Sequence, residues 1–149
     1  MPMFRKLINT TDDLALTILR LVLGVVFFAH GAQKALGWFG GYGFSATMAF
    51  FTQQAHIPAA FAFLAICAEF LGGIGLILGF LGRVAAFGIA CNMVVAVAMV
   101  HWQFGFWANW LGNQKGEGIE YHLLAIAIAL AIMIKGSGAL SVDRALSKS

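Results

Sequence analysis

Charge is scarce in this sequence. Only 10% of its 149 residues are Asp, Glu, Lys or Arg, whereas 61% are hydrophobic. A soluble domain of this length needs a charged exterior, and a disordered chain has few large apolar residues, so the composition excludes both classes. The lipid bilayer is the solvent that suits such a chain, and we predict an integral membrane protein.

Cysteine is rare too, and the net charge is small. Cys67 and Cys91 each stand alone within an apolar run, without a CxxC or other metal-type spacing. We therefore expect two small core residues here, and neither a thiol–disulfide relay nor a cysteine metal site. The net charge of +3 comes largely from basic residues at predicted helix ends, so no nucleic acid partner is needed to explain it.

Long apolar runs make up much of the sequence. A helix needs ~20 apolar residues to cross the hydrocarbon core, and four runs approach or exceed that length, over residues 14–36, 59–81, 84–102 and 118–134. Because irregular backbone cannot face lipid, we predict an all-α, integral membrane four-helix bundle that forms a single domain over residues 1–149. The stretch ATMAFFTQQAHIP, between the first two runs, is too short and polar to span and predicts an amphipathic or re-entrant helix.

Basic residues are distributed unevenly over the connections. With four spans, both termini lie on one side of the membrane, and that side holds Arg5, Lys6, Arg83, Lys135, Arg144 and Lys148. The opposite loops hold only Lys34 and Lys115. The positive-inside rule therefore predicts that both termini are cytoplasmic.

Polar residues gather at the opposite, outer end of the predicted bundle. They come from the end of the first helix, the end of the third and the start of the fourth: His30, Gln33, Lys34, His101, Glu117, Glu120 and His122. Ionisable residues within a membrane usually mark function, so we predict a shared polar pocket there. A quinone site, a proton relay and a polar network that merely holds the bundle together all fit this set. A metal site is a fourth alternative, although no local ligand pair such as HxxxH occurs.

Two further points concern individual carboxylates. Glu120 and His122 are two residues apart, hence ~200° around a helix, so at most one of them should face the pocket. Glu69 lies near the middle of the second helix, where a carboxylate costs about 2.5–3.5 kcal/mol on insertion scales. We expect Glu69 to be protonated, paired or facing a polar cavity. Arg20 is the candidate counter-charge, unless it extends to the inner interface, and Asn92 is a second possible partner.

Several segments together resemble one family. The resemblance extends over about residues 14–144 and rests on four segments, in this order: RLVLGVVFFAHGAQKALGWFGGYG, AEFLGGIGLILGFLGRVAA, the VHW at the end of the third run and EGIEYHLLAIAIALAIMIKGSGALSVDR. This set is similar to the DoxX family of small bacterial inner-membrane proteins. The resemblance implies a multi-pass protein of the bacterial plasma membrane. The polar positions of the family map onto His30, Gln33, Lys34, Glu69, His101, Glu117, Glu120 and His122.

The resemblance also suggests a redox context. The family is named after a subunit associated with a thiosulfate:quinone oxidoreductase, and other members are linked to oxidative, thiol or electrophile stress. The chain has no haem-attachment motif, Rossmann fingerprint or cysteine pair, so any electron carrier would be a quinone or a cofactor of a partner.

Three functions are consistent with these observations. The first is a quinone-interacting redox protein whose outer pocket binds the head group. The second is a non-catalytic membrane subunit or scaffold for soluble oxidoreductases. The third is a small-solute or proton transporter, which four helices could form only as a homo-oligomer and which no inverted repeat supports. The sequence leaves open whether the chain is itself an enzyme.

Overall fold

The computed structural model describes residues 2–148, and that part of the chain is helical with no strand. The α-helices are α1 (Pro2–Ile8), α2 (Leu14–Leu36), α3 (Gly43–Ala49), α4 (Ala59–Leu78), α5 (Gly82–Ala96), α6 (Glu120–Lys135) and α7 (Val142–Ser147). Short 3-10 segments, η1 (Trp38–Gly40) and η4 (Trp102–Phe104), and π-helical segments, η2 (Phe50–Gln54) and η3 (Val97–His101), extend them. The predicted all-α class is confirmed.

Local signals explain where the long helices begin and end. The Asp13 side chain accepts hydrogen bonds from the backbone N–H groups of Ala15 and Leu16, which caps the start of α2. α2 ends at Gly37, whose φ of 73° is the left-handed conformation that glycine adopts at little cost. Pro58 precedes the first residue of α4. These bounds match the predicted first run at both ends and the second run at its start.

Glycines let α2 and α4 approach each other until their backbones touch. A Cβ atom added at Gly31 would lie 2.4 Å from Phe70 Cα, and one at Gly73 would lie 2.5 Å from Phe28 N. At Gly24 the nearest atom would be Ile77 N, at 2.9 Å. Such close approach is typical of helix pairs in membranes. It also sets the antiparallel register of α2 against α4.

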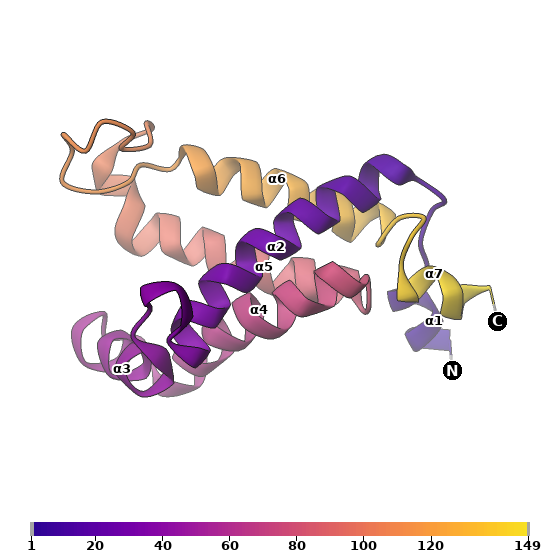
Figure 1. Cartoon of the computed structure of the whole chain (residues 1–149), viewed down its shortest axis with the longest axis horizontal. Coiled ribbons are helices and arrows are strands. Elements are labelled where there is room, and N and C mark those ends of the chain that lie inside the picture. The colour runs from indigo at the N-terminus through magenta and orange to yellow at the C-terminus, as the bar shows by residue number, and fades with distance from the viewer. Residues whose placement is uncertain (1, 149) are drawn as a thin grey trace.

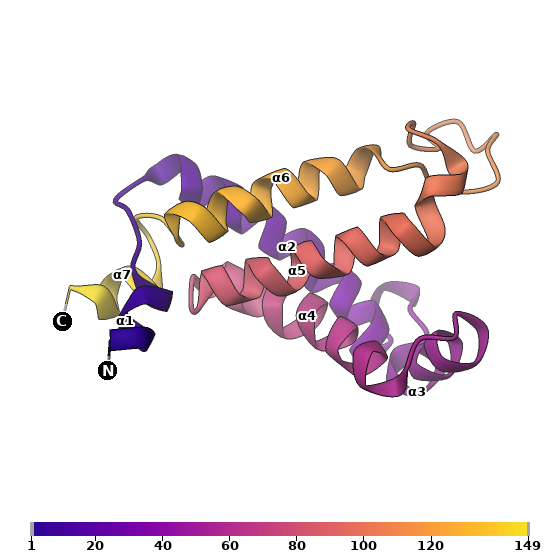
Figure 2. The ribbon, with the colours of Figure 1, turned by 180° about the vertical axis from the view of Figure 1, so that it is seen from behind.

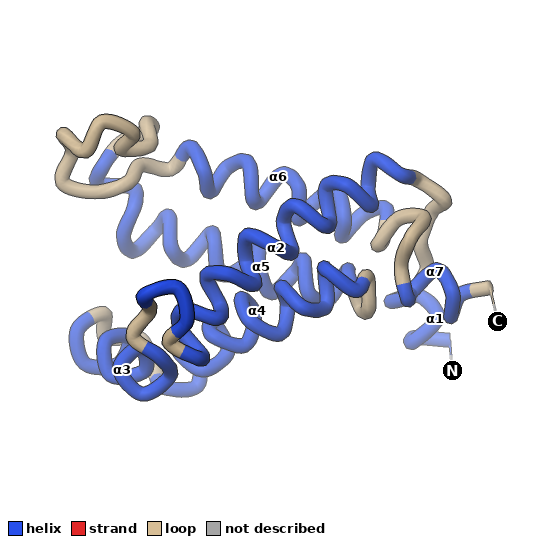
Figure 3. Tube along the Cα trace, viewed as in Figure 1, coloured by secondary structure: helices blue, strands red, loops and turns tan. Residues whose placement is uncertain are grey.

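The four long helices form two pairs, α2 with α4 and α5 with α6. The pairs meet near the end that carries both termini, and they diverge toward the opposite end (Figures 1 and 2). Apolar side chains from all four helices form the core where the pairs meet, including Leu23, Phe27, Leu76, Ile89, Ala129 and Ile132. The longest loop, residues 105–119, lies at the divergent end (Figure 3).

A network of buried polar groups closes the end near the termini. The Arg20 guanidinium donates to the carbonyl oxygens of Ser137 (2.8 Å), Ile77 (2.8 Å), Leu140 (2.6 Å) and Leu76. Arg20 thus ties the last turn of α4 to the segment between α6 and α7.

Asp143, in α7, has the corresponding role at the start of α5. Its carboxylate accepts from the N–H groups of Leu81 (2.8 Å) and Gly82 (3.0 Å) and from the Ser137 hydroxyl (2.6 Å). It therefore satisfies backbone donors that the first turn of a helix leaves free. The late GxGAxSxD pattern serves this structural network.

Within the described residues, three helical segments are long and apolar enough to cross a membrane: Leu14–Leu36, Ala59–Leu78 and Gly82–Phe104. The fourth predicted run is present as α6, whose 16 residues extend ~24 Å, short of the ~30 Å hydrocarbon core. A fourth span therefore stays a prediction. The predicted short helix between the first two runs is present as α3 continued by η2.

Candidate binding cavity

A cavity of about 1140 Å³ lies between the two helix pairs, toward their divergent end. Its walls come from α2, α4, α5, η2, η3, the 105–119 loop and the first turn of α6. Most lining side chains are apolar, with a small number of polar groups among them. The volume is slightly above the ~300–1,000 Å³ usual for ligand pockets.

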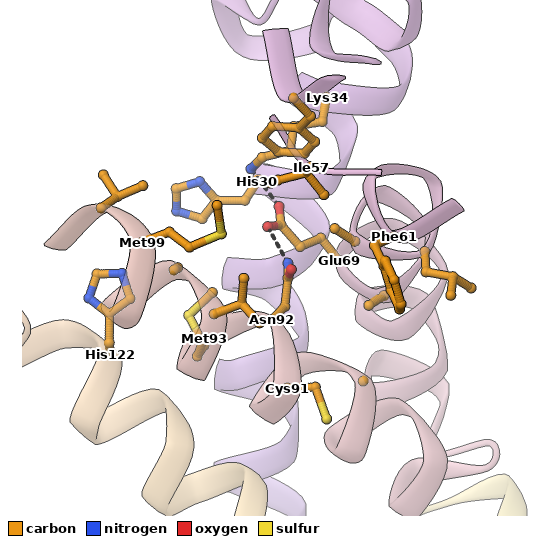
Figure 4. Close-up of a pocket in the computed structure, with 18 of the residues that line it drawn as sticks. His30, Lys34, Ile57, Phe61, Glu69, Cys91, Asn92, Met93, Met99 and His122 are labelled. Atoms are coloured by element: carbon orange, nitrogen blue, oxygen red, sulfur yellow. Dashed lines mark hydrogen bonds and ion pairs between the residues drawn. The ribbon is translucent and has the colours of Figure 1, made fainter. Parts of the chain in front are cut away.

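Three polar side chains from three helices meet in the wall of this cavity (Figure 4). Lys34 Nζ of α2 lies 2.5 Å from Glu69 Oε2 of α4, and the Asn92 amide of α5 donates to Glu69 Oε1 at 2.8 Å. Glu69 is only 6% exposed. Both of its carboxylate oxygens therefore have partners, as a buried charge requires.

The register of the helices explains why Lys34 can reach Glu69. Gly31 is in backbone contact with Phe70, so Lys34 leaves α2 about one turn beyond the level of Glu69. Side chains on a helix lean toward its N-terminus. The Lys34 side chain thus extends back along α2 to the carboxylate.

Of the two arrangements left open for Arg20, the pairing with Glu69 does not form, whereas Asn92, the second candidate partner, does bind Glu69. Gly24 is level with Ile77, and Gly31 with Phe70, so Arg20 lies at the far end of α2 from Glu69. Eleven residues separate Arg20 from Gly31, which corresponds to roughly 17 Å along the helix. The Arg20 guanidinium is saturated instead by carbonyl oxygens at the end near the termini.

Two histidines face each other on the opposite wall. The rings of His101 (η3) and His122 (α6) have centroids 4.0 Å apart, and His101 Nδ1 is 2.7 Å from the Glu117 carbonyl oxygen. His122 is 5% exposed, and its Nδ1 has no hydrogen-bond partner among the described residues. Both rings line the cavity. His122 therefore brings an unsatisfied polar atom to a largely apolar wall.

His30 completes the polar lining from the α2 side. Its ring lies 6.5 Å from Phe27 and 6.4 Å from Tyr121, centroid to centroid. In Figure 4, His30 and His122 lie on the same side of the Glu69–Asn92 hydrogen bond, with Met99 between them.

Glu117 and Glu120, near the start of α6, have a structural role. Glu117 Oε2 accepts from the Asn109 N–H (2.6 Å), and Glu120 Oε2 accepts from the Ala108 N–H (2.9 Å). They fold the 105–119 loop back against α6. Glu117 still borders the cavity, whereas of Glu120 and His122 it is His122 that lines it.

Gln33 also lies outside the cavity lining. Its amide donates to the Phe39 carbonyl oxygen at 3.2 Å, within the turn that follows α2. Of the sequence-predicted site residues, the structure thus brings His30, Lys34, Glu69, His101, Glu117 and His122 to one cavity.

His56, which no sequence motif indicates, also lines the cavity. Its φ of 55° is unusual for a residue other than glycine, and such strain is concentrated at functional sites. Residues of both π-helical segments, η2 and η3, line the same cavity, and π-helical turns also occur frequently at functional sites. Backbone geometry of this kind could not be read from the sequence.

The arrangement suits hydrogen bonding to an apolar ligand better than metal coordination. Within residues 2–148, no three His, Cys, Asp or Glu side chains come together as a metal site. Lys34, His30, His101 and His122 instead place nitrogen atoms around an apolar space. Lys34, His30 and His122 can donate to oxygen atoms of a bound molecule, whereas His101 directs its Nδ1–H to the Glu117 carbonyl oxygen and leaves Nε2 as an acceptor.

The sequence model of the DoxX family matches residues 15–102, which is more than half of the chain. The chain belongs to the DoxX family. The matched part includes His30, Lys34, Glu69, Asn92 and His101, whereas His122 follows it.

Two curated relatives resemble this DoxX-family chain over nearly its full length. "Inner membrane protein YqjF" of Escherichia coli (strain K12) is 28% identical over 92% of the chain and 95% of the relative. "Putative oxidoreductase CatD" of Bacillus subtilis (strain 168) is 27% identical over 91% of the chain and 89% of the relative. No solved structure matches the chain. Together with its apolar helices, these relatives identify the chain as a membrane protein of this family.

Proposed function

We propose that this DoxX-family protein binds the head group of a quinone in the cavity and takes part in a quinone-linked or stress-related redox process. The observation that carries the proposal is a large apolar cavity with hydrogen-bond donors on two opposite walls. The oxidoreductase name of CatD supports the redox part.

A quinone head group fits the chemistry of this lining. It is a flat, mostly apolar ring with a carbonyl oxygen at each end, and those oxygens only accept hydrogen bonds. Lys34 and His30 offer N–H donors from α2, and His122 offers one from α6. Met93 and Met99 lie between these walls (Figure 4), where their flexible thioethers can pack against a ring.

The Lys34–Glu69–Asn92 group would orient one end of the ligand. Glu69 and Asn92 hold the Lys34 ammonium at the cavity wall, and an ammonium has two further N–H donors to offer. A quinone takes up two electrons and two protons to become a hydroquinone. In this proposal the electrons come from an oxidoreductase partner and the two protons come from water, while Lys34, His30 and His122 supply hydrogen bonds to the carbonyl oxygens.

We further propose that the cavity lies toward the periplasmic side of a bacterial inner membrane and that both termini are cytoplasmic. The basic residues support this orientation, because six of them lie at the end near the termini. The exposed aromatic residues Trp107 and Trp110 are typical of a membrane interface, which fits a position of the 105–119 loop at one of the two membrane surfaces.

A scaffold for soluble oxidoreductases is the second candidate, and the same loop favours it. Trp107, Trp110 and Leu111 are among the most exposed apolar side chains of the described residues. Such a patch could bind a partner protein instead of lipid. In that case the cavity residues would matter for stability and not for ligand binding.

Native mass spectrometry with lipid extraction tests the first proposal. We expect a quinone to co-purify with the wild-type protein and to be lost from Glu69→Gln and His30→Ala. Gln53→Ala is the control, because the Gln53 side chain is exposed and does not line the cavity, and it should retain the quinone. Folded samples that carry only phospholipid in every variant would favour the scaffold.

A further inference from the structure

The cavity opens sideways between α4 and α5. Its lining includes side chains that are also exposed on the outer surface of these two helices. On α4 these are Phe61, Leu64 and Leu71, and on α5 they are Cys91 and Val95. A side chain that lines a cavity and is also exposed lies at its opening. We call the part of this opening that is bordered by Phe61, Leu64, Cys91 and Val95 the lateral mouth.

Helix packing explains the position of this mouth. From their connecting turn outward, α4 and α5 are in close contact as far as Gly88, where an added Cβ would lie 3.2 Å from Ala68 Cβ. Beyond that contact the two helix pairs diverge (Figures 1 and 2). The mouth residues Leu64 and Val95 lie on this far side of the Ala68–Gly88 contact.

The mouth lies at the depth of the hydrocarbon core. Both helices are candidate membrane spans. Val95 is 13 residues beyond the start of α5 at Gly82, which places it ~20 Å along the helix in a core ~30 Å thick. A molecule that passes through this opening therefore enters from lipid and not from water.

The polar groups divide the cavity into two parts. In Figure 4, Phe61 and Cys91 lie on one side of the Glu69–Asn92 hydrogen bond, toward the mouth, and His30 and His122 lie on the other side. The hydrogen-bonding groups thus face the inner part, whereas the mouth is apolar. This polarity matches a molecule with a polar head group and a long apolar tail.

We propose that the ligand is a tail-bearing, membrane-dissolved molecule that enters between α4 and α5, with its head group at Lys34 and the histidines and its tail leaving through the Leu64–Val95 mouth. This inference rests on the proposed function for the nature of the head group. It adds the class of ligand, an isoprenoid-tailed quinone, and the route by which it enters.

Two matched pairs of tryptophan variants test the route. Val95→Trp fills the mouth, and Val94→Trp is its control, because Val94 is similarly exposed (54% against 46%) but does not line the cavity. Leu64→Trp and Phe63→Trp form the same comparison on α4, where only Leu64 lines the cavity. The second pair decides the question if a variant of the first does not fold.

Binding is measured in lipid nanodiscs with two quinones that share a head group, one without a tail and one with an isoprenoid tail. Each quinone is added to the same concentration in the membrane, so that the stronger partitioning of the tailed quinone into lipid does not affect the comparison. We expect Val95→Trp and Leu64→Trp to weaken binding of the tailed quinone by about tenfold or more and to leave the tailless quinone unaffected. The two control variants should bind both quinones as the wild type does.

The outcomes separate this inference from the proposed function. If both quinones bind the wild type and all four tryptophan variants bind the tailed form equally well, the lateral route is wrong while the quinone site stands. If neither quinone binds, the proposed function is wrong. The lateral route is then tested by extracting and identifying the lipids that co-purify with each variant. A tailed lipid retained by the wild type and controls but lost from both mouth variants supports the route, and equal lipid content overturns it.

Discussion

Lys34 Nζ lies 2.5 Å from Glu69 Oε2, and this ion pair joins α2 to α4 at the level where their backbones touch through Gly31. The pair is therefore part of the helix interface as well as of the cavity wall. An ion pair in this position stabilises the fold only while both partners are present, because a single charge would be left without compensation in a low-dielectric environment.

A double-mutant cycle on this pair is the first prediction. Lys34→Met and Glu69→Gln should each lower the free energy of unfolding, and the double variant should lose less than the sum of the two. We expect a coupling energy of roughly 0.5–3 kcal/mol. Equilibrium unfolding in mixed micelles measures it.

Lys34→Met combined with Arg144→Gln provides the control, because Arg144 pairs with Asp12 near the other end of the bundle. That combination should be additive. Additive losses for Lys34 and Glu69 as well would contradict the role of their ion pair.

The two adjacent glycines Gly72 and Gly73 should respond differently to alanine. A Cβ at Gly73 would lie 2.5 Å from Phe28 N, and backbone cannot move aside cheaply. At Gly72 the nearest atoms are 3.6 Å away, which is ordinary contact. Gly73→Ala should therefore separate α2 from α4 and lower the unfolding temperature clearly. Gly72→Ala should be neutral or stabilising, since alanine favours a helix over glycine by about 1 kcal/mol.

Arg20→Lys should be strongly destabilising although the charge is kept. The guanidinium bonds to several carbonyl oxygens at once, and hydrogen bonds to charged groups are worth about 1.5–3 kcal/mol each. A lysine cannot match that planar set of donors. We expect a loss of at least about 3 kcal/mol, measured by the same unfolding titration.

The same experiment tests whether Arg20 acts on Glu69. Because the two residues have separate partners, Arg20→Lys and Glu69→Gln should be additive within about 0.5 kcal/mol. A large coupling between them would restore the ion pair that the structure excludes.

Orientation in the membrane can be tested with single cysteines. With Cys67 and Cys91 replaced, we expect Lys115→Cys to react with a membrane-impermeant maleimide in intact cells. Lys148→Cys should react only after the cells are permeabilised. The reverse pattern would place the cavity on the cytoplasmic side and would refute the proposed topology.

Much of the secondary structure could be predicted because its signals are local. The apolar run at residues 14–36 coincides with α2, since Asp13 caps its start and Gly37 ends it. Pro58 likewise places the start of α4. The clustering of polar residues at one end also followed from local information, because alternating helix direction brings the ends of α2 and α5 and the start of α6 to the same level.

The partners of those polar residues depend on tertiary structure. Glu69 pairs with Lys34 and not with Arg20 because Gly31 and Gly73 set the register of α2 against α4. Likewise, His122 faces the cavity while Glu120 holds the 105–119 loop. A shift of one turn would change each partner without changing any local signal.

The sequence by itself thus determined the helices, the membrane environment and the end of the bundle at which polar groups meet, because composition, periodicity and caps act over a few residues. Only the tertiary structure decided which groups bond, which wall each one occupies and that the cavity opens between α4 and α5. These features follow from backbone contacts between helices far apart in the chain, such as Gly31 with Phe70 and Gly88 with Ala68.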